Sequence, residues 1–149
     1  MSYKKKNTAS FGKRQEYSVI AELLKRNFDI YTTLVDDKGI DCIIRLNDKK
    51  YLDIQIKARS ETAKQWSRFA ALSFTTRKNF FFIFYTEKNK RFWVIPSKNV
   101  KRLGSKNKSG KYKGKITLNL PTIDKGKKAK IFKKYRDGFE LLGSQDNRD

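Results

Sequence analysis

The order of apolar and polar residues predicts an amphipathic helix near the start of the chain, over residues 10–28. Its apolar positions recur at helical spacing and are Tyr17, Ile20, Leu23, Leu24 and Phe28. Ser10 is a suitable N-cap, because its side-chain oxygen can accept a hydrogen bond from the first turn. Residues 29–39 then predict a short strand followed by a turn.

Period-two alternation next predicts a β-hairpin, with strands at 40–46 and 51–58 joined by the turn "NDKK". Successive side chains of a strand point to opposite faces. One face of this hairpin is apolar and consists of Cys42, Ile44, Leu46, Leu52, Ile54 and Ile56. The other face collects Asp41, Asp53, Gln55 and Lys57. A plain hairpin has no need of two carboxylates, an amide and a lysine on one face.

The rest of the chain predicts further strands and two helices. Strands are expected at 69–75, 79–86, 91–96 and 116–120, with a connection at 61–68. The run "NFFFIFYT" at 79–86 is almost wholly apolar, which indicates a strand buried on both faces. Ser97 is expected to cap a short helix that ends near Leu103. Residues 127–142 have a helical period, which Gly138 weakens. The core positions of that helix are Phe132, Tyr135 and Phe139.

This order of elements predicts an α/β or α+β fold with a central mixed sheet. The chain has 149 residues, of which 38% are hydrophobic, and this suits one domain with one core. We expect residues 1–9 to form a basic, mobile arm and residues 143–149 to form a frayed tail.

The charge of the chain favours a nucleic-acid partner. Lys and Arg number 36 against 15 Asp and Glu, which gives a net charge of +21. Such a field repels itself unless an anionic partner neutralises it, and nucleic acid comes first, ahead of an anionic membrane surface. No window approaches the ~20 apolar residues of a membrane span, and the basic start lacks the apolar stretch of a signal peptide. We therefore expect a cytoplasmic protein.

Missing residue types exclude several kinds of enzyme. The chain has no histidine, which excludes a Ser-His-Asp triad, a Cys-His pair and a histidine-based nuclease. Its one cysteine, Cys42, excludes an internal disulfide and zinc clusters. The stretch "GSKNKSGKY" at 104–112 is no P-loop, because its glycine spacing is too long and Tyr112 follows the lysine. Any enzyme here must work with carboxylates, Lys, Tyr or Ser.

The polar face of the hairpin suits phosphodiester hydrolysis. Mg²⁺ takes oxygen ligands from carboxylates, carbonyls, water and substrate phosphates. Such a metal polarises the phosphate and activates water, and a nearby lysine can orient that water or stabilise developing negative charge. This chemistry needs no histidine.

"GID" at 39–41 and "DIQIK" at 53–57, with a hairpin between them, resemble the core of the PD-(D/E)xK nuclease superfamily. The Q-x-K ending is most similar to the Mrr-like restriction endonucleases. Those proteins carry a glutamate on the first helix, and Glu16 in "GKRQEY" matches it. The resemblance covers roughly residues 10–103. It implies a restriction-endonuclease-like core in the order α-β-β-β-α-β, with a central mixed sheet flanked by helices.

The resemblance implies a role for each matching residue. Asp41 would be the principal metal ligand. Gln55 would donate its side-chain carbonyl to the metal, and Ile56 its backbone carbonyl. Lys57 would be the catalytic lysine, and Glu16 would bind a second metal or its water.

The chain departs from the family pattern at the motif itself. Gln55 replaces a charged ligand, so we expect a lower metal affinity. Asp53 is an additional carboxylate on the same face and could compensate. Ile40 stands where the family name has a proline.

Phosphate contacts are expected from basic residues outside the motif. They are Lys4, Lys5, Lys6, Arg68, Arg77, Lys106, Lys108, Lys111, Lys113 and Lys115. Tyr112 lies among the last five and could stack on a base or simply pack. For Trp66 a hydrophobic lid is favoured over base stacking.

Plainer explanations stay open for the motif residues. Lys57 and Asp53 could form a surface pair that contributes little stability. Asp41 could end a turn, where Asp is common, and Glu16 could lie on a solvated helix face.

The sequence thus predicts a DNA endonuclease that depends on Mg²⁺ or Mn²⁺. One chain holds one such site, so a double-strand cut would need a homodimer or two events. Two alternatives remain. The neutral Gln55 motivates a non-catalytic nucleic-acid-binding module on the same fold, and the +21 charge alone would suit an RNA-associated basic protein.

Overall fold

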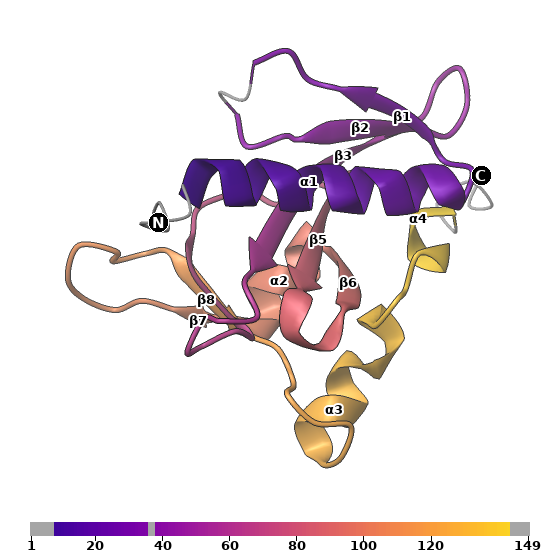
Figure 1. The fold of residues 1–149 in the computed structure, drawn as a ribbon. Helices are drawn as coiled ribbons and strands as arrows, with labels where there is room; N and C mark the ends of the chain where they lie inside the picture. Colours follow the sequence, from indigo (N-terminus) through magenta and orange to yellow (C-terminus); the bar gives the residue numbers. More distant parts are fainter. Residues whose placement is uncertain (1–7, 36–37, 144–149) are drawn as a thin grey trace, which may run out of the picture.

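The computed structural model describes residues 8–35 and 38–143 (Figure 1). Its helices are α1 (Thr8–Lys25), α2 (Ser97–Leu103), α3 (Lys127–Phe132) and α4 (Glu140–Gly143), with the short 3-10 helices η1 (Glu87–Asn89) and η2 (Lys133–Tyr135). Its strands are β1 (Asp29–Thr32), β2 (Cys42–Arg45), β3 (Tyr51–Arg59), β4 (Arg68–Leu72), β5 (Phe80–Thr86), β6 (Arg91–Pro96), β7 (Ser105–Lys106) and β8 (Ile116–Asn119). Lys4, Lys5 and Lys6 lie outside the described residues.

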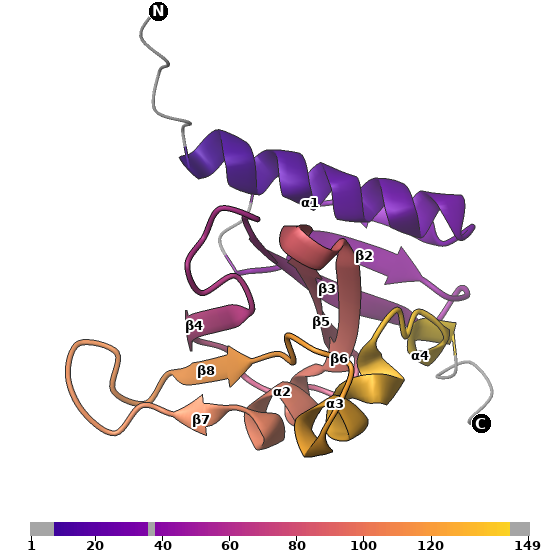
Figure 2. The ribbon, with the colours of Figure 1, turned by 60° about the horizontal axis from the view of Figure 1, so that its bottom comes forward.

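The strands of the described residues form two sheets. The larger has the order β1-β2-β3-β5-β6 and the smaller the order β4-β8-β7. In the larger sheet, β3 and β5 pair in parallel and the other neighbours pair antiparallel. Helix α1 lies across one face of it, and α2 and α3 lie beside the smaller sheet on the other side (Figures 1 and 2). The expected α/β class, with a central mixed sheet flanked by helices, is confirmed.

The crossover between the parallel strands differs from the expected α-β-β-β-α-β order. That order would place a helix between β3 and the next strand of the sheet, whereas this chain places β4 there. Strand β4 lies outside the larger sheet and pairs with β8, from a later part of the chain. The smaller sheet therefore lies next to β3, as Figure 2 shows.

Two hydrophobic cores lie on the two faces of β5. Phe81 and Ile83 join the core beneath α1. Phe80, Phe82 and Phe84 join the core between the larger sheet, the smaller sheet and α2. Each buried side chain of this size contributes about 1.5–3 kcal/mol. The sequence-based prediction of a strand buried on both faces is confirmed.

Strand β3 shares this two-sided environment. Its apolar residues Leu52, Ile54 and Ile56 belong to the core beneath α1. Its polar residues Asp53, Gln55 and Lys57 pair in register with Phe80, Phe82 and Phe84 of β5. Paired residues of neighbouring strands face the same way, so the polar side chains point toward the smaller sheet. The alternation predicted for the hairpin is confirmed, and its polar face looks into the space between two sheets.

The apolar stripe predicted for the first helix is partly wrong. Val19, Ile20 and Leu23 are the buried apolar residues of α1, while Tyr17 is 59% exposed and Leu24 54% exposed. The buried row is spaced four residues apart, and a turn of 3.6 residues carries Tyr17 and Leu24 off it. The helix begins at Thr8, so Ser10 lies inside it and is not its N-cap.

Two other helix predictions need correction. Ser97 begins α2 but does not cap it, because its hydroxyl accepts a hydrogen bond from the backbone N–H of Arg77 and donates one to the carbonyl of Arg77. The predicted helix over 127–142 is broken into α3, η2 and α4. At the break, a Cβ on Gly138 would lie 2.7 Å from the carbonyl oxygen of Lys134, so this tight turn favours glycine.

Candidate active site

Asp41 is fixed against β3 just before β2 begins. It is buried, and its backbone N–H donates to the carbonyl of Ile54 at 2.8 Å. Its Oδ2 accepts a hydrogen bond from the backbone N–H of Ile56 at 2.6 Å. Because Cys42 pairs with Ile54, continuing the register by one residue sets Asp41 opposite Gln55. The carboxylate of Asp41 is thus held at the centre of the Gln55–Lys57 segment.

Gln55 packs over the turn that precedes Asp41. Gly39 has φ +70°, and a Cβ there would lie 3.1 Å from Nε2 of Gln55. Any larger residue at this position would therefore be strained and would push the Gln55 amide aside. The "GID" and "QIK" segments, 14 residues apart from Asp41 to Gln55 (55 − 41), meet in space as the motif predicts.

Gln55 and Lys57 open into a cavity of about 410 Å³ between β3 and β4. Its other lining residues include Arg59 from β3, and Arg68, Phe69, Ala70 and Ser73 from β4 and the residues after it. Arg68 was predicted as a phosphate contact, and the structure brings it to the same cavity as Lys57. A cavity of this volume can hold several water molecules.

Glu16 lies on the N-terminal half of α1 and is tied to Lys13. The Lys13 ammonium approaches both Glu16 oxygens at 3.4 Å, and the Glu16 side chain is 18% exposed. The charge of Glu16 and its hydrogen bond raise the pKa of Lys13, and the more distant Asp41 adds to the rise. Lys13 was not among the predicted site residues, although its position three residues before Glu16 on a helix is a recognisable signal.

The electrostatics of Cys42 link the two carboxylates. Burial, followed by the negative charges of Asp41 and then Glu16, raises the pKa of the Cys42 thiol to about 12. The structure sets Asp41 opposite Gln55, and the role of Glu16 beside them stays a prediction.

Asp53 has a different partner from the one the sequence suggested. Its Oδ2 accepts a hydrogen bond from the Arg77 guanidinium at 2.7 Å, and that guanidinium lies 4.7 Å from the ring centre of Phe80. The partner of the Asp53 carboxylate is therefore Arg77 and not Lys57. The Arg77–Asp53 pair joins residues 24 positions apart, so no local pattern could have revealed it.

The donor set suits a hard cation with a partial protein cage. Within residues 8–35 and 38–143, no three Asp, Glu, Cys or His side chains group as a metal centre. The predicted ligands, which are the carboxylates of Glu16 and Asp41 and the amide of Gln55, would supply oxygen atoms. Mg²⁺ is commonly bound by one or two carboxylates together with water and substrate phosphates, which fits this set.

The predicted lysines of the basic loop lie on β7 and the loop that joins it to β8, which projects from the molecule at the left of Figure 1. The base of the loop is closed by hydrogen bonds from Asn107 N–H to the Lys115 carbonyl and from Gly114 N–H to the Asn107 carbonyl, both 2.8 Å. Lys111 and Lys115 lie 5.5 Å and 5.4 Å from the Tyr112 ring centre. Tyr112 is exposed, so it is not a core residue.

The remaining aromatic predictions have mixed outcomes. Phe132, Tyr135 and Phe139 are buried, as predicted for core positions. Trp66 is half-buried in the connection before β4.

None of the described helices is long and apolar enough to cross a membrane.

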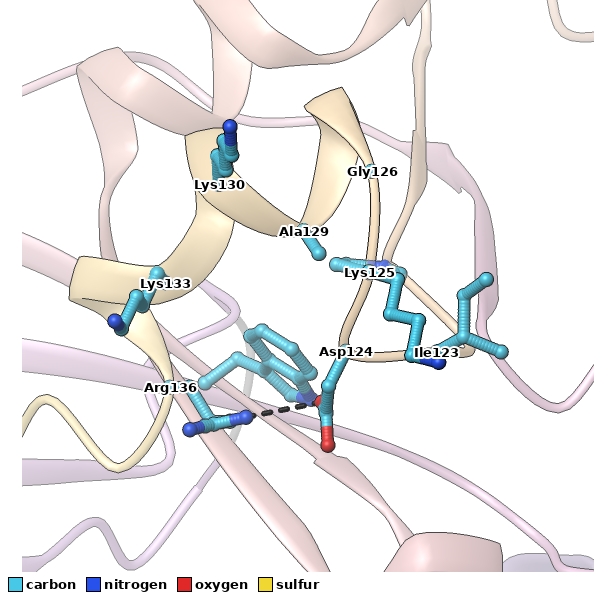
Figure 3. Close-up of a pocket in the computed structure, with 10 residues that line it drawn as sticks. Ile123, Asp124, Lys125, Gly126, Ala129, Lys130, Lys133 and Arg136 are labelled. Atoms are coloured by element: carbon cyan, nitrogen blue, oxygen red, sulfur yellow. Dashed lines mark hydrogen bonds and ion pairs between the residues drawn. The ribbon is translucent and has the colours of Figure 1, made fainter.

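A second cavity, of about 490 Å³, lies beside α3 and contains no predicted site residue (Figure 3). Asp124 at its rim pairs with Arg136 at 2.9 Å and with Arg91. The hydrogen bond from Arg91, followed by the charges of both arginines, lowers the pKa of Asp124 to about 2. This triad fastens the loop before α3 to β6 and to Arg136, the residue after η2, which indicates a structural role.

No protein-family model matches the chain, and no curated protein matches it. Among solved structures, the fold is similar to that of the bacterial homing endonuclease I-Ssp6803I, with a TM-score of 0.69. The two share 18% sequence identity, and the match covers 94% of this chain and 95% of the other. At this identity the similarity shows a shared fold over nearly the whole of both chains.

Proposed function

We propose that the protein is a metal-dependent DNA endonuclease whose site consists of Glu16, Asp41, Gln55, Ile56 and Lys57. The observation that carries the proposal is the 2.6 Å hydrogen bond from the Ile56 N–H to Asp41 Oδ2. It holds the proposed principal ligand beside the proposed amide ligand and the proposed catalytic lysine. The resemblance to PD-(D/E)xK nucleases, most closely the Mrr-like group, assigns these residues the same roles.

Each residue has a distinct task in this proposal. Asp41, Gln55 and the carbonyl of Ile56 would hold Mg²⁺ or Mn²⁺, with Glu16 at a second ion or its water. When bound, the metal supplies Lewis-acid polarisation of the phosphate and a more acidic water. Lys57 orients that water or stabilises negative charge that develops on the phosphate. The neutral Gln55 brings one charge fewer than a carboxylate would, so the metal is held more weakly.

Duplex DNA is the proposed substrate. The structural neighbour is named as a homing endonuclease, and the +21 charge suits a polyanion. The basic β7–β8 loop and Arg68 offer cations on the side where Gln55 and Lys57 open. Lys4, Lys5 and Lys6 would add phosphate contacts, and a homodimer would supply a second site for the second strand. A cytoplasmic location remains our expectation.

A second candidate is a nucleic-acid-binding module without hydrolysis. The observation that favours it is the neutral Gln55 together with the Arg77–Asp53 pair, which occupies the carboxylate that could have compensated. Metal-dependent cutting separates the two candidates. An RNA-associated role predicts instead that binding is indifferent to Mg²⁺ and to loss of Asp41.

The test is a cleavage panel of plasmid, single-stranded DNA, branched DNA and RNA, each with EDTA, Mg²⁺ or Mn²⁺. Lys57→Ala is compared with Lys49→Ala, which removes the same charge from the exposed β2–β3 turn. We expect metal-dependent cutting of DNA that Lys57→Ala abolishes and Lys49→Ala preserves. Binding without cutting in every lane would refute the nuclease for these substrates and favour the binding module.

A further inference from the structure

The smaller sheet has a polar outer face. Its residues Phe69, Leu118 and Ile116 are buried in the core between the sheets. The alternate positions face outward, and in register Arg68 pairs with Asn119 while Ser105 pairs with Thr117. This outer face therefore presents the exposed residues Arg68, Asn119 and Ser105. Thr117 is buried between them, and its hydroxyl donates to Oδ1 of Asn107 at 3.3 Å.

A cavity of about 430 Å³ lies between this face and α3. It is lined by Leu103, Ser105, Thr117, Asn119, Lys127, Lys128, Ile131 and Phe132. Figure 2 shows α3 beside the ends of β7 and β8. The floor thus offers hydroxyl and amide groups, and one wall offers two lysines.

The charge of this wall is uncompensated. Lys127 and Lys128 are exposed, and neither forms an ion pair with a carboxylate of the described residues. Residues 125–136 contain six lysines, one arginine and no acidic residue. The neighbouring Asp124 is already paired with Arg91 and Arg136. An anionic partner would relieve the repulsion among these lysines.

The outer face is continuous with the candidate active site. Arg68 lines the site cavity together with Gln55 and Lys57, and its register partner Asn119 lines the α3 cavity. Strands lie about 4.8 Å apart, so the path from β4 across β8 to β7 is about 10 Å long. That length matches the axial rise of about three base pairs.

We infer that the outer face of β4-β8-β7 and the lysines of α3 form a track for the phosphodiester backbone of duplex DNA. The track, defined by the exposed residues Arg68, Asn119, Ser105, Lys127 and Lys128, leads from the site to α3. Ammonium, hydroxyl and amide groups are the usual contacts to phosphates, and they position a duplex without reading its sequence. The inference rests on the proposed function for the identity of the substrate.

The test measures DNA binding in EDTA, where no cutting occurs. Lys127→Gln with Lys128→Gln is compared with Lys25→Gln with Lys49→Gln, which removes two exposed charges from α1 and the β2–β3 turn. Each lost phosphate contact lowers the slope of log K against log salt by about 0.9, so we expect a decrease of about 1.8 for the first variant. Its Kd should rise by about tenfold at 0.15 M salt, against about twofold for the control.

A second variant tests the floor of the track. Asn119 is exposed, so Asn119→Ala is expected to leave the fold intact, to weaken DNA binding and to leave the salt slope unchanged. Circular dichroism of all variants confirms that loss of binding is not loss of structure.

The outcomes separate this inference from the proposed nuclease activity. A selective loss of DNA binding in the track variants supports the track even if the wild-type protein cuts nothing. Equal losses in the track and control variants would overturn the track even if cutting is seen. A selective loss for duplex RNA alone, or no nucleic-acid binding by the wild type, would also overturn it.

Discussion

Asp41 should carry stability and activity through two different properties, its hydrogen bond and its charge. The Oδ2 atom accepts the buried N–H of Ile56, whereas the negative charge serves the proposed metal. Asp41→Ala removes both properties. Asp41→Asn keeps an oxygen that can accept from the N–H but removes the charge.

The magnitudes follow from the burial of this contact. In Asp41→Ala the Ile56 N–H is left without its acceptor inside the fold, which costs about 1–3 kcal/mol. At about 2.1 cal/mol/K of unfolding entropy per residue, a chain of 149 residues then loses about 3–10 °C in melting temperature. Asp41→Asn exchanges a charged acceptor for a neutral one, which costs about 1 kcal/mol or about 3 °C.

The effect on DNA nicking should be larger than the effect on stability, and it should be equal in Asp41→Ala and Asp41→Asn. Changes to groups that only support a metal ligand cost 10- to 100-fold, so loss of the ligand charge should cost at least about 100-fold. Thermal unfolding by circular dichroism and nicking of plasmid DNA in Mg²⁺ measure the two effects on the same samples. Wild-type nicking by Asp41→Asn would refute the ligand role, and an unchanged melting temperature in Asp41→Ala would refute the structural role.

Three further predictions address the surroundings of the site. Gln55→Glu adds a ligand charge and should lower the Mg²⁺ concentration that half-saturates nicking; an unchanged metal titration would contradict the role of Gln55. Arg77→Ala leaves the buried Asp53 carboxylate without its cation. Because Arg77 is itself 42% exposed, we expect the free energy of unfolding in urea to fall by about 1–2 kcal/mol. Adding Asp53→Asn to the same chain should partly restore it. Burial raises the pKa of Cys42 from 9.0 to about 12, so the folded state holds the thiol proton more tightly than the unfolded state. The resulting stabilisation of the folded state is fully present below about pH 9 and is lost as the pH rises toward 12. The thiol should react with Ellman's reagent at pH 8 only after unfolding, and rapid reaction of the native protein would contradict this.

The larger sheet was the most predictable part of the fold, because its signals are local. Strand β6 has the bounds that the pattern predicted, and β5 begins one residue later than expected. The turn of the hairpin is fixed by Asn47, whose side-chain oxygen accepts the backbone N–H groups of Lys49 and Lys50. Alternation, a continuous apolar run and a turn residue each act within a few positions, so a single sequence contains them.

The smaller sheet was only half predictable. The segments of β4 and β8 were expected as strands, but their pairing joins Arg68 to Asn119 across 51 residues (119 − 68). Neither strand is long enough for alternation to identify its partner. The helix prediction over 127–142 failed for a related reason, because the tertiary turn at Gly138 overrides a helical period that the sequence does contain.

The same division between local and distant contacts explains what was predicted about the site. Asp41, Gln55 and Lys57 belong to one hairpin, so their spacing was enough to bring them together. Asp53 lies on the same face of β3 as Gln55 and Lys57, so strand alternation alone could not distinguish it from the site residues. Arg77 reaches Asp53 from the segment before β5, and Ser97 holds the Arg77 backbone through two hydrogen bonds of 3.1 Å. The fold thus pairs Asp53 with Arg77 and sets Asp41 opposite Gln55. Strand alternation could not reveal this difference, because it depends on where the segment before β5 and the start of α2 lie relative to the hairpin.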